Sequence, residues 1–318
     1  MARVVVTGGV GFIGYHLTRA LLARGDDVAI LDDFSDAPYP EADKRRNERD
    51  LVREFPRVSI VHGCVTDRAA LEPLFDGTDL VVHLAGLAGV RPSFAAPARY
   101  ARVNVEGTAV VQELARQRGV HRFVFASSSS VYGNSTPLPA QEDSPAVEPE
   151  SPYAASKRSA ELVASALCRG TPSMRCAALR FFTVYGPRQR PEMAITLFAR
   201  AALAGRPLPV FGDGSMRRDF THVDDIVRGI VAAAERAPVG FRAYNLGSSA
   251  PVVLEALVRA IGEAAGVEPQ VERSPVPLGD VSATYADITR AREELGWEPH
   301  IPLAQGLKSV LAWVKEHP

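Results

Sequence analysis

Short apolar runs and longer amphipathic stretches alternate along the first part of the chain. The β-branched run Val4–Val6 leads into a glycine-rich segment, a stretch of helical periodicity follows as far as Gly25, and a second apolar run ends at Asp32 and Asp33. Short apolar runs bounded by turn residues are typical of buried strands, and a repeat of three to four residues is typical of amphipathic helices. The opening segment therefore predicts strand, turn, helix and strand.

The same unit recurs further along the chain. Apolar runs lie at 58–64, 79–86, 121–130 and 175–182, with helical patterns between them. Strands that alternate with helices form a parallel sheet covered on both faces. The predicted fold class is α/β, a Rossmann-type doubly wound parallel sheet. Ligands of such folds bind at the carboxyl ends of the strands, so the polar residues that end these runs are candidates for function.

The character of the sequence changes after about residue 187. Proline- and glycine-rich connections such as GPRQRP, GRPLPVFGDG and VPLGD separate further helical segments. We expect a Rossmann domain over residues 1–186, to which the chain returns at about 220–248, and a smaller C-terminal α/β substrate-binding lobe mainly over 187–318. The charged run EADKRRNERD at 41–50 is most simply a solvated helix or loop.

Composition excludes several classes of function. The 318 residues are 46% hydrophobic, enough for a large core, and 36 basic residues nearly balance 37 acidic ones, so no global field attracts nucleic acid or an anionic membrane. Three cysteines without metal-type spacing indicate reduced packing thiols, and no metal is expected. No apolar stretch is long enough for a membrane span or precedes the first strand as a signal peptide. A soluble cytoplasmic protein is predicted.

The glycine-rich segment carries the first chemical signal. Gly8, Gly11 and Gly14 have the spacing that allows a tight turn, close approach to a pyrophosphate and close packing of helix on strand. The N-terminus of the following helix would face the phosphates. Asp32, 18 residues after Gly14, lies where a carboxylate can accept hydrogen bonds from the adenine ribose and would repel a 2′-phosphate. This segment predicts NAD rather than NADP.

The second signal is the pair Tyr153 and Lys157. Four residues apart on one helix, they share a face. A free phenol loses its proton near pH 10, but a lysine cation and a positively charged nicotinamide both favour the phenolate, so Tyr153 is predicted to act as a base near neutral pH. A surface tyrosine with an unrelated lysine is the alternative for any isolated pair. The preceding dinucleotide motif and the serine run at 127–130 favour catalysis.

Seven motifs now identify a family resemblance: TGGVGFIG, HLAG, NVEGT, SSSSVYG, SPYAASK, RFFTVYGP and RRDFTHVDD. In this order they resemble the extended short-chain dehydrogenase/reductase family, the nucleotide-sugar epimerases and dehydratases. The resemblance implies a homodimer, a tightly bound NAD, and a nucleoside diphosphate sugar that is oxidised and re-reduced in place. It implies Ser128 as the hydroxyl that assists Tyr153. The residues that it implies at NAD are Gly8, Gly11, Phe12, Ile13, Gly14, Asp32, Val65, Leu84, Ala85, Asn104, Tyr153 and Lys157.

Ser129 and Ser130 discriminate between the reactions of this family. Similar dehydratases carry Asp-Glu at these two positions, because loss of water from a 4-keto sugar needs a base for the carbon 5 proton and an acid for the leaving hydroxyl. A serine hydroxyl is too weak for either role. Similar sugar-acid decarboxylases typically have a glutamate in this run, so decarboxylation is disfavoured too. Epimerisation needs only Ser128, Tyr153, Lys157 and NAD.

The segment RFFTVYGPRQRPEMAI at 180–195 most resembles the UDP-glucuronic acid 4-epimerases. A sugar carboxylate is best held by planar, charge-assisted donors and small hydroxyls. The candidates for this role are Arg190, Thr183, Ser129 and Ser130. Solvated loop arginines, or arginines on phosphate, are the alternative for Arg188 and Arg190. By resemblance, Arg218 would hold the pyrophosphate and Asp280 the ribose of the substrate.

The predicted function is therefore an NAD-dependent epimerase that inverts the 4-hydroxyl of a nucleoside diphosphate sugar through a 4-keto intermediate. UDP-glucuronate is the expected substrate and UDP-galacturonate the expected product. The alternative within enzymes is a 4-epimerase of UDP-glucose or a UDP-N-acetylhexosamine. From another class, the alternative is a non-catalytic NAD-sensing protein, but such proteins commonly lose the tyrosine or the lysine, and both are present here.

Overall fold

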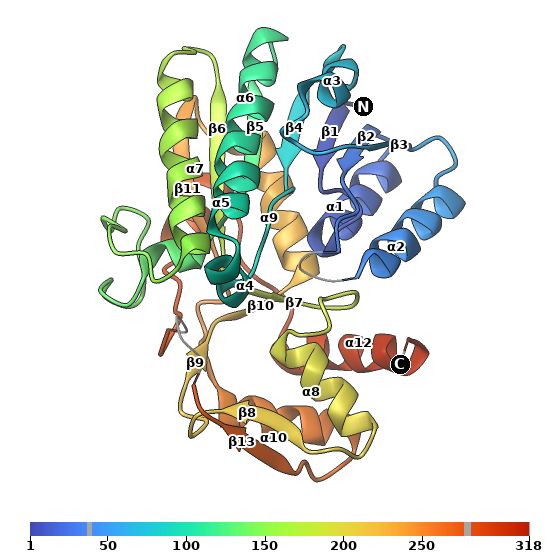
Figure 1. The fold of residues 1–318 in the computed structure, drawn as a ribbon, viewed down its shortest axis with the longest axis vertical. Helices are drawn as coiled ribbons and strands as arrows, with labels where there is room; N and C mark the ends of the chain where they lie inside the picture. Colours follow the sequence, from blue (N-terminus) through green and yellow to red (C-terminus); the bar gives the residue numbers. More distant parts are fainter. Residues whose placement is uncertain (37–39, 277–280, 318) are drawn as a thin grey trace.

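A seven-stranded parallel sheet forms the larger part of the molecule, in the strand order β11-β6-β5-β4-β1-β2-β3 (Figure 1). The computed structural model describes residues 1–36, 40–276 and 281–317. The fold class is as predicted, and the returning chain supplies the edge strand β11. The strands of the sheet are β1 (Arg3–Thr7), β2 (Asp27–Asp32), β3 (Ser59–His62), β4 (Leu80–His83), β5 (Arg122–Ser128), β6 (Arg175–Phe181) and β11 (Gly240–Leu246).

Helices cover both faces of this sheet. One face carries α1 (Phe12–Ala23), α2 (Glu41–Glu54) and α9 (Val223–Arg236), and the other carries α6 (Gly107–Gln117) and α7 (Pro152–Arg169). Each face of the sheet has its own apolar core. Within β1, Val4 and Val6 point into the core beneath α1 and α9, and Val5 points into the core beneath α6 and α7. Because side chains alternate along a strand and both faces are buried, the strands are continuous apolar runs rather than alternating ones.

The C-terminal lobe has a core of its own beneath the carboxyl ends of the sheet (Figure 1). Its helices are α8 (Ala194–Leu203), α10 (Leu254–Ala265) and α12 (Leu303–Glu316), and β8 (Leu208–Phe211) pairs in parallel with β13 (Val271–Ser274). Two further strand pairs form small sheets separate from the seven-stranded one. They are β7 (Thr183–Tyr185) with β10 (Phe220–His222), and β9 (Arg217–Arg218) with β12 (Val252–Val253). The division into two domains near residue 187 stays a prediction.

Short helical segments complete the described chain. They are α3 (Arg68–Leu71), α4 (Val90–Ala95), α5 (Pro97–Tyr100), α11 (Thr289–Leu295), the 3₁₀ turns Glu72–Phe75 and Ser129–Tyr132, and the π-helical turn Ala101–Glu106. None of the helices described for this chain has the length and apolar character that crossing a membrane requires.

The charged run at 41–50 differs from its predicted solvated state. It lies in α2, but Lys44 and Asn47 are only 6% and 3% exposed. Together with Leu51 they recur every three to four residues, so one face of α2 packs on the molecule. The Asn47 Nδ2 donates a hydrogen bond to the Val10 carbonyl oxygen at 2.9 Å, which joins α2 to the turn after β1.

Candidate active site

One cavity of about 770 Å³ lies between the carboxyl ends of the sheet and the C-terminal lobe. Its position follows from the strand order, because β1 has β2 on one side and β4 on the other, and such reversals open a crevice. The predicted site residues that line it are Gly8, Gly11, Phe12, Ile13, Gly14, Asp32, Val65, Leu84, Ala85, Ser128, Ser129, Ser130, Tyr153, Lys157, Thr183, Arg190 and Arg218. Asp280 lies outside the described residues.

Asn104 is the predicted cofactor residue that does not line this cavity within the described chain. Its Oδ1 accepts a hydrogen bond from the Leu87 N–H at 2.8 Å, and its Nδ2 donates to the Leu87 carbonyl at 3.0 Å and the Ser156 Oγ at 2.9 Å. The side chain thus fixes the segment after β4 against α7. It supports the cavity from behind.

The turn after β1 packs so closely on neighbouring backbone that it requires glycine at two positions. Gly8 has a φ of +73°, and a Cβ there would lie 2.7 Å from the Ala85 nitrogen. A Cβ on Gly14 would lie 2.0 Å from the Gly8 carbonyl oxygen. Gly11 and the first turn of α1 line the cavity, and within the described residues no side chain caps this helix end, so its N–H groups can bind phosphate. These residues fit the pyrophosphate of a dinucleotide.

Asp32 ends β2 at the far side of this turn. Its carboxylate accepts a hydrogen bond from the Phe34 N–H at 3.0 Å, and the Lys44 Nζ lies 3.7 Å away. Burial raises the pKa of Asp32, and the Lys44 charge opposes this shift. Lys44 also lines the cavity, which sequence reasoning missed. Its only signal was the spacing with Asn47 and Leu51 in a run that otherwise resembles a solvated surface.

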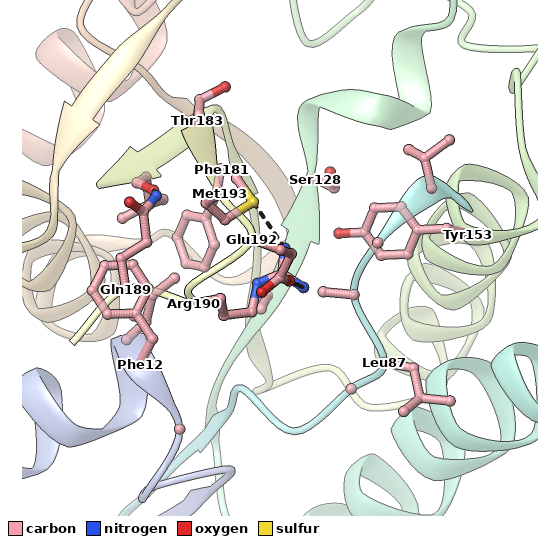
Figure 2. Close-up of a pocket in the computed structure, with 18 of the residues that line it drawn as sticks. Phe12, Leu87, Ser128, Tyr153, Phe181, Thr183, Gln189, Arg190, Glu192 and Met193 are labelled. Atoms are coloured by element: carbon pink, nitrogen blue, oxygen red, sulfur yellow. Dashed lines mark hydrogen bonds and ion pairs between the residues drawn. The ribbon is translucent and has the colours of Figure 1, made fainter. Parts of the chain in front are cut away.

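Tyr153 and Lys157 project from the first turns of α7. The helix begins where the Ser151 Oγ accepts from the Ala154 N–H at 3.2 Å, which fixes the start of the helix one turn before Lys157. Ser128, at the end of β5, lines the same cavity near the Tyr153 hydroxyl (Figure 2) and acts to lower the pKa of that phenol. The structure therefore brings together the three predicted catalytic residues.

The pKa of Tyr153 differs from the sequence expectation. Burial raises it, and the nearby Ser128 hydroxyl and the charge of Arg190 only partly oppose this shift. The Lys157 Nζ instead donates to the Ala126 carbonyl oxygen at 2.8 Å, and burial lowers the pKa of Lys157 to about 8. The predicted lowering by Lys157 is thus wrong for the chain alone, because desolvation of the phenol outweighs the nearby charges.

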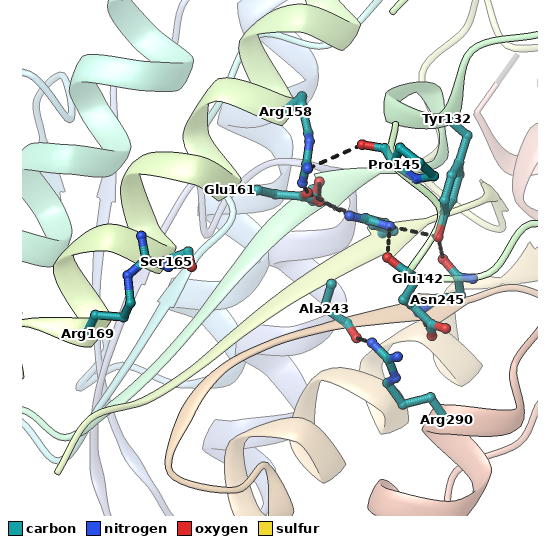
Figure 3. Close-up of polar contacts among 12 residues, drawn as sticks. Tyr132, Glu142, Pro145, Arg158, Glu161, Ser165, Arg169, Ala243, Asn245 and Arg290 are labelled. Atoms are coloured by element: carbon teal, nitrogen blue, oxygen red, sulfur yellow. Dashed lines mark hydrogen bonds and ion pairs between the residues drawn. The ribbon is translucent and has the colours of Figure 1, made fainter. Parts of the chain in front are cut away.

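A buried polar network braces this side of the cavity. The Glu161 carboxylate accepts from the Ser127 Oγ at 2.6 Å and from the Arg180 Nη2 at 2.8 Å. Arg180 also donates to the Tyr132 hydroxyl at 2.9 Å, which in turn donates to the Asn245 Oδ1 at 2.6 Å (Figure 3). The network joins α7 to the strand ends that carry the serine run, so the catalytic residues are held by regular elements.

The opposite side of the cavity is a loop after β7. Figure 2 shows Arg190 and Glu192 facing Tyr153. The Arg190 Nη1 lies 3.3 Å from the Glu192 Oε1, and its Nη2 donates to the Met193 Sδ at 3.1 Å. Sequence reasoning missed Glu192. The Arg190 guanidinium is thus already paired with a carboxylate, the type of group that the predicted substrate would bring.

The end of the cavity farthest from the glycine turn lies in the C-terminal lobe. Arg218 of β9 lines it and donates to the Arg217 carbonyl oxygen at 2.9 Å. Arg91, which sequence reasoning did not select, lies over the Phe211 ring at 4.6 Å from its centroid. Among the described residues, no group of three or more His, Cys, Asp or Glu side chains could hold a metal ion.

Comparison with known proteins places this geometry in a family. The profile described as "NAD dependent epimerase/dehydratase family" matches residues 4–247. The chain belongs to this family. The predicted resemblance, the NAD cofactor and the class of nucleotide-sugar epimerases are thereby confirmed at the level of the family.

Two relatives and one solved structure extend over almost the whole chain. The UDP-glucuronate 4-epimerase of Thermodesulfobacterium geofontis is 37% identical over 322 residues, which cover 100% of this chain and 97% of that protein. The UDP-glucose 4-epimerase of Mycolicibacterium smegmatis is 37% identical over 318 residues, 98% of each chain. The UDP-glucuronic acid 4-epimerase of Bacillus cereus, solved with UDP-glucuronic acid and NAD, has a TM-score of 0.90 at 31% identity and covers 98% of this chain and 99% of its own.

Proposed function

We propose that this protein is an NAD-dependent 4-epimerase that converts UDP-glucuronate into UDP-galacturonate. The observation that carries the proposal is the guanidinium of Arg190, which lines the same cavity as Tyr153 and already binds a carboxylate, that of Glu192. A planar, charge-assisted donor suits a sugar carboxylate. The hydroxyls of Ser129, Ser130 and Thr183 line the same cavity and offer further donors.

The catalytic residues act on the 4-hydroxyl of the sugar. Tyr153 takes the hydroxyl proton, and the nearby Ser128 hydroxyl favours the phenolate that forms. Lys157, one turn further along α7, adds positive charge to the same cavity. A bound NAD would supply the acceptor and donor of the carbon 4 hydride, and its positive charge would favour the phenolate that burial disfavours. The 4-keto sugar turns over in the cavity between the two transfers. Tyr153 then returns the proton to the inverted oxygen.

Arg190 has a second role in this mechanism. The 4-keto form of a hexuronate is a β-keto acid. It loses carbon dioxide when the bond from carbon 5 to the carboxylate aligns with the π orbitals of the ketone. A guanidinium that fixes the carboxylate in another orientation prevents that alignment. Dehydration is disfavoured because the cavity presents Ser129 and Ser130 where an acid and a base would be needed.

A 4-epimerase of UDP-glucose is the second candidate. It is favoured by the Mycolicibacterium smegmatis relative, which is as similar in sequence as the Thermodesulfobacterium geofontis protein. The Glu192 carboxylate beside the sugar site repels a second carboxylate. To the extent that Arg190 does not neutralise its charge, Glu192 therefore favours a neutral sugar.

Product analysis tests the proposal. Purified protein is incubated with UDP-glucuronate or UDP-glucose, and the product sugars are resolved by NMR. We expect UDP-galacturonate as the main product and no conversion by Tyr153→Phe. Conversion of UDP-glucose alone would contradict the uronate assignment. A pentose or a 4-keto-6-deoxy sugar as main product would contradict epimerisation.

We also propose that the protein is a cytoplasmic homodimer. The homodimer rests on the family resemblance, and the location on the cysteine usage of the sequence. Light scattering of the purified protein would give its mass in solution, and a monomer would contradict the proposed homodimer.

A further inference from the structure

Arg188, two residues before Arg190, is buried in contacts that join three parts of the chain. Its side chain is 12% exposed, so the predicted alternative of a solvated loop arginine does not hold for it. The Nη1 donates to the Asn47 Oδ1 at 2.5 Å, and the Nη2 donates to the Asp50 Oδ2 at 2.6 Å. Both acceptors lie on α2. The planar fork of a guanidinium is suited to binding two acceptors at once.

Aromatic rings from two other helices cover the same guanidinium. The Arg188 Cζ lies 3.9 Å from the ring centroid of Tyr15 on α1 and 4.5 Å from that of Trp313 on α12. The neighbouring Pro187 carbonyl oxygen lies 3.0 Å from the Nε2 of His16, also on α1. Cation–π contacts that are shielded from water are stronger than exposed ones. The loop is thus fixed to α1, α2 and α12 around this one side chain.

The contacts continue from Arg188 to the turn that binds the cofactor. Asn47, which accepts from Arg188, donates from its Nδ2 to the Val10 carbonyl oxygen at 2.9 Å. Val10 lies between Gly8 and Gly11 in the glycine turn. Lys44, one turn earlier on the same face of α2, lies 3.7 Å from the Asp32 carboxylate. One helix face therefore contacts both elements of the cofactor site and Arg188.

The contacts continue in the other direction to the sugar site. Arg188 has a φ of +68°, a backbone conformation that a residue with a side chain adopts only where its surroundings hold it. The next residue, Gln189, donates from its Nε2 to the Val184 carbonyl oxygen at 2.7 Å, and Arg190 then enters the cavity. The orientation of Arg190 thus depends on a backbone bend that the Arg188 side chain fixes in place.

We propose that Arg188 is a positioning residue for the sugar site. It holds Arg190 in the orientation that binds the substrate carboxylate, by fixing the loop to α2 and through it to the cofactor turn. Discrimination between an acidic and a neutral sugar therefore depends on a side chain that touches neither ligand. This inference rests on the proposed function, since it assigns Arg190 to a carboxylate.

The test compares two substrates in matched variants. Arg188→Lys keeps the charge but loses the fork that reaches both Asn47 and Asp50. We expect the ratio of kcat/KM for UDP-glucuronate to that for UDP-glucose to fall about tenfold, a typical coupling between residues in one network. In an Arg190→Ala background the same change should alter the ratio less than about twofold. Arg53→Ala is the control, because Arg53 also pairs with Asp50 but is 80% exposed, and it should keep the wild-type ratio.

The ratio separates positioning from a general loss of stability. A role in stability alone would lower kcat/KM alike on both substrates, and an unchanged ratio would overturn the inference. Full additivity of Arg188→Lys with Arg190→Ala would overturn it too. Asp50→Asn removes the ionic contact from the other side, and should shift the ratio in the same direction even if Arg188→Lys does not fold. A wild type that prefers UDP-glucose overturns this inference and the proposed function together, whereas an unchanged ratio in a wild type that prefers UDP-glucuronate overturns only the inference.

Discussion

The two walls of the cavity are built in different ways. The reaction wall, which carries Ser128, Tyr153 and Lys157, consists of the end of β5 and the start of α7. The loop wall, which carries Arg190 and Glu192, lies in the connection between β7 and α8. The chemistry shared by the family thus stands on regular elements, and Arg190, the charged residue proposed to select the sugar, stands on a loop, which can change without unfolding the sheet.

The ion pairs of the two walls differ in burial. Behind the reaction wall, the side chains of Glu161 and Arg180 are 0% and 2% exposed, whereas Arg190 and Glu192 are 16% and 49% exposed. Removing one partner of a buried pair leaves an uncompensated charge and costs about 3–5 kcal/mol, but a pair open to solvent is worth about 0–1 kcal/mol. Changes in the reaction wall should therefore affect every substrate, and changes in the loop wall should separate acidic from neutral sugars.

The largest effect is expected from Tyr153→Phe. Loss of the acid-base group should lower turnover about 100- to 10,000-fold on UDP-glucuronate and UDP-glucose alike, because both reactions begin at the 4-hydroxyl. Thermal stability and substrate affinity, measured by calorimetry, should stay near wild type and serve as the control. Near-normal turnover on either sugar would remove Tyr153 from its proposed role.

Arg190→Ala should affect only the acidic sugar. A lost charge-assisted hydrogen bond of about 1.5–3 kcal/mol lowers kcat/KM for UDP-glucuronate about 10- to 150-fold. The value for UDP-glucose should change far less, and some pentose should form because the carboxylate is no longer held. Steady-state kinetics on both sugars give the comparison, with Arg190→Lys as the variant that keeps the charge. An equal loss on both sugars would mean that Arg190 does not bind the carboxylate.

Each wall also has a buried histidine behind it. His83 contacts the Thr7 Oγ1 at 2.7 Å, and His16 lies 3.0 Å from the Pro187 carbonyl oxygen. Burial lowers the pKa of His83 to about 3 and that of His16 to about 4. Because both values lie below the unfolded value near 6.5, the stability from each neutral histidine is fully present above pH 6.5 and is lost as pH falls.

The histidines therefore predict a stability difference at mild acidity. At pH 5 each neutral histidine has lost about 2 kcal/mol of its contribution to the free energy of unfolding. Urea denaturation of wild type and His83→Gln at pH 7 and pH 5 tests this. The decline in the wild type should exceed that in the variant by about 2 kcal/mol. Parallel declines would show that His83 takes up a proton in the folded state.

The smallest effect is expected from Glu192→Gln, in the opposite direction to Arg190→Ala. Glu192 competes with the substrate carboxylate for Arg190, and a half-exposed pair is worth about 0–1 kcal/mol. The KM for UDP-glucuronate should fall by up to about fivefold, and the KM for UDP-glucose should stay unchanged. A higher KM for UDP-glucuronate would instead assign Glu192 to holding Arg190 in place.

The sequence was sufficient for the fold, and most of the site residues predicted from it line the cavity. Apolar periodicity predicts the strands because both faces of the sheet are buried, and the glycine spacing predicts the turn because side chains there would meet backbone atoms. The motifs of the serine run and of Tyr153 and Lys157 could be located because each lies at the end of a strand or the start of a helix.

The features that the sequence could not predict depend on contacts between distant segments. Lys44 and Asn47 lie in a charged run that resembles a solvated surface, and their burial follows from the acceptors Asp32 and Val10, far away in sequence. The burial of Arg188 likewise requires rings from α1 and α12. The raised pKa of Tyr153 could not be foreseen, since desolvation is a property of the packed cavity.

A competition assay tests the proposed substrate most directly. Equimolar UDP-glucuronate and UDP-glucose are incubated together with wild-type protein, and initial rates of both 4-epimers are followed by NMR, so that their ratio equals the ratio of the two kcat/KM values. If Arg190 holds the sugar carboxylate, UDP-galacturonate should form at least about ten times faster than UDP-galactose, as the charge-assisted contact requires. Equal rates, or faster formation of UDP-galactose, would contradict the uronate assignment.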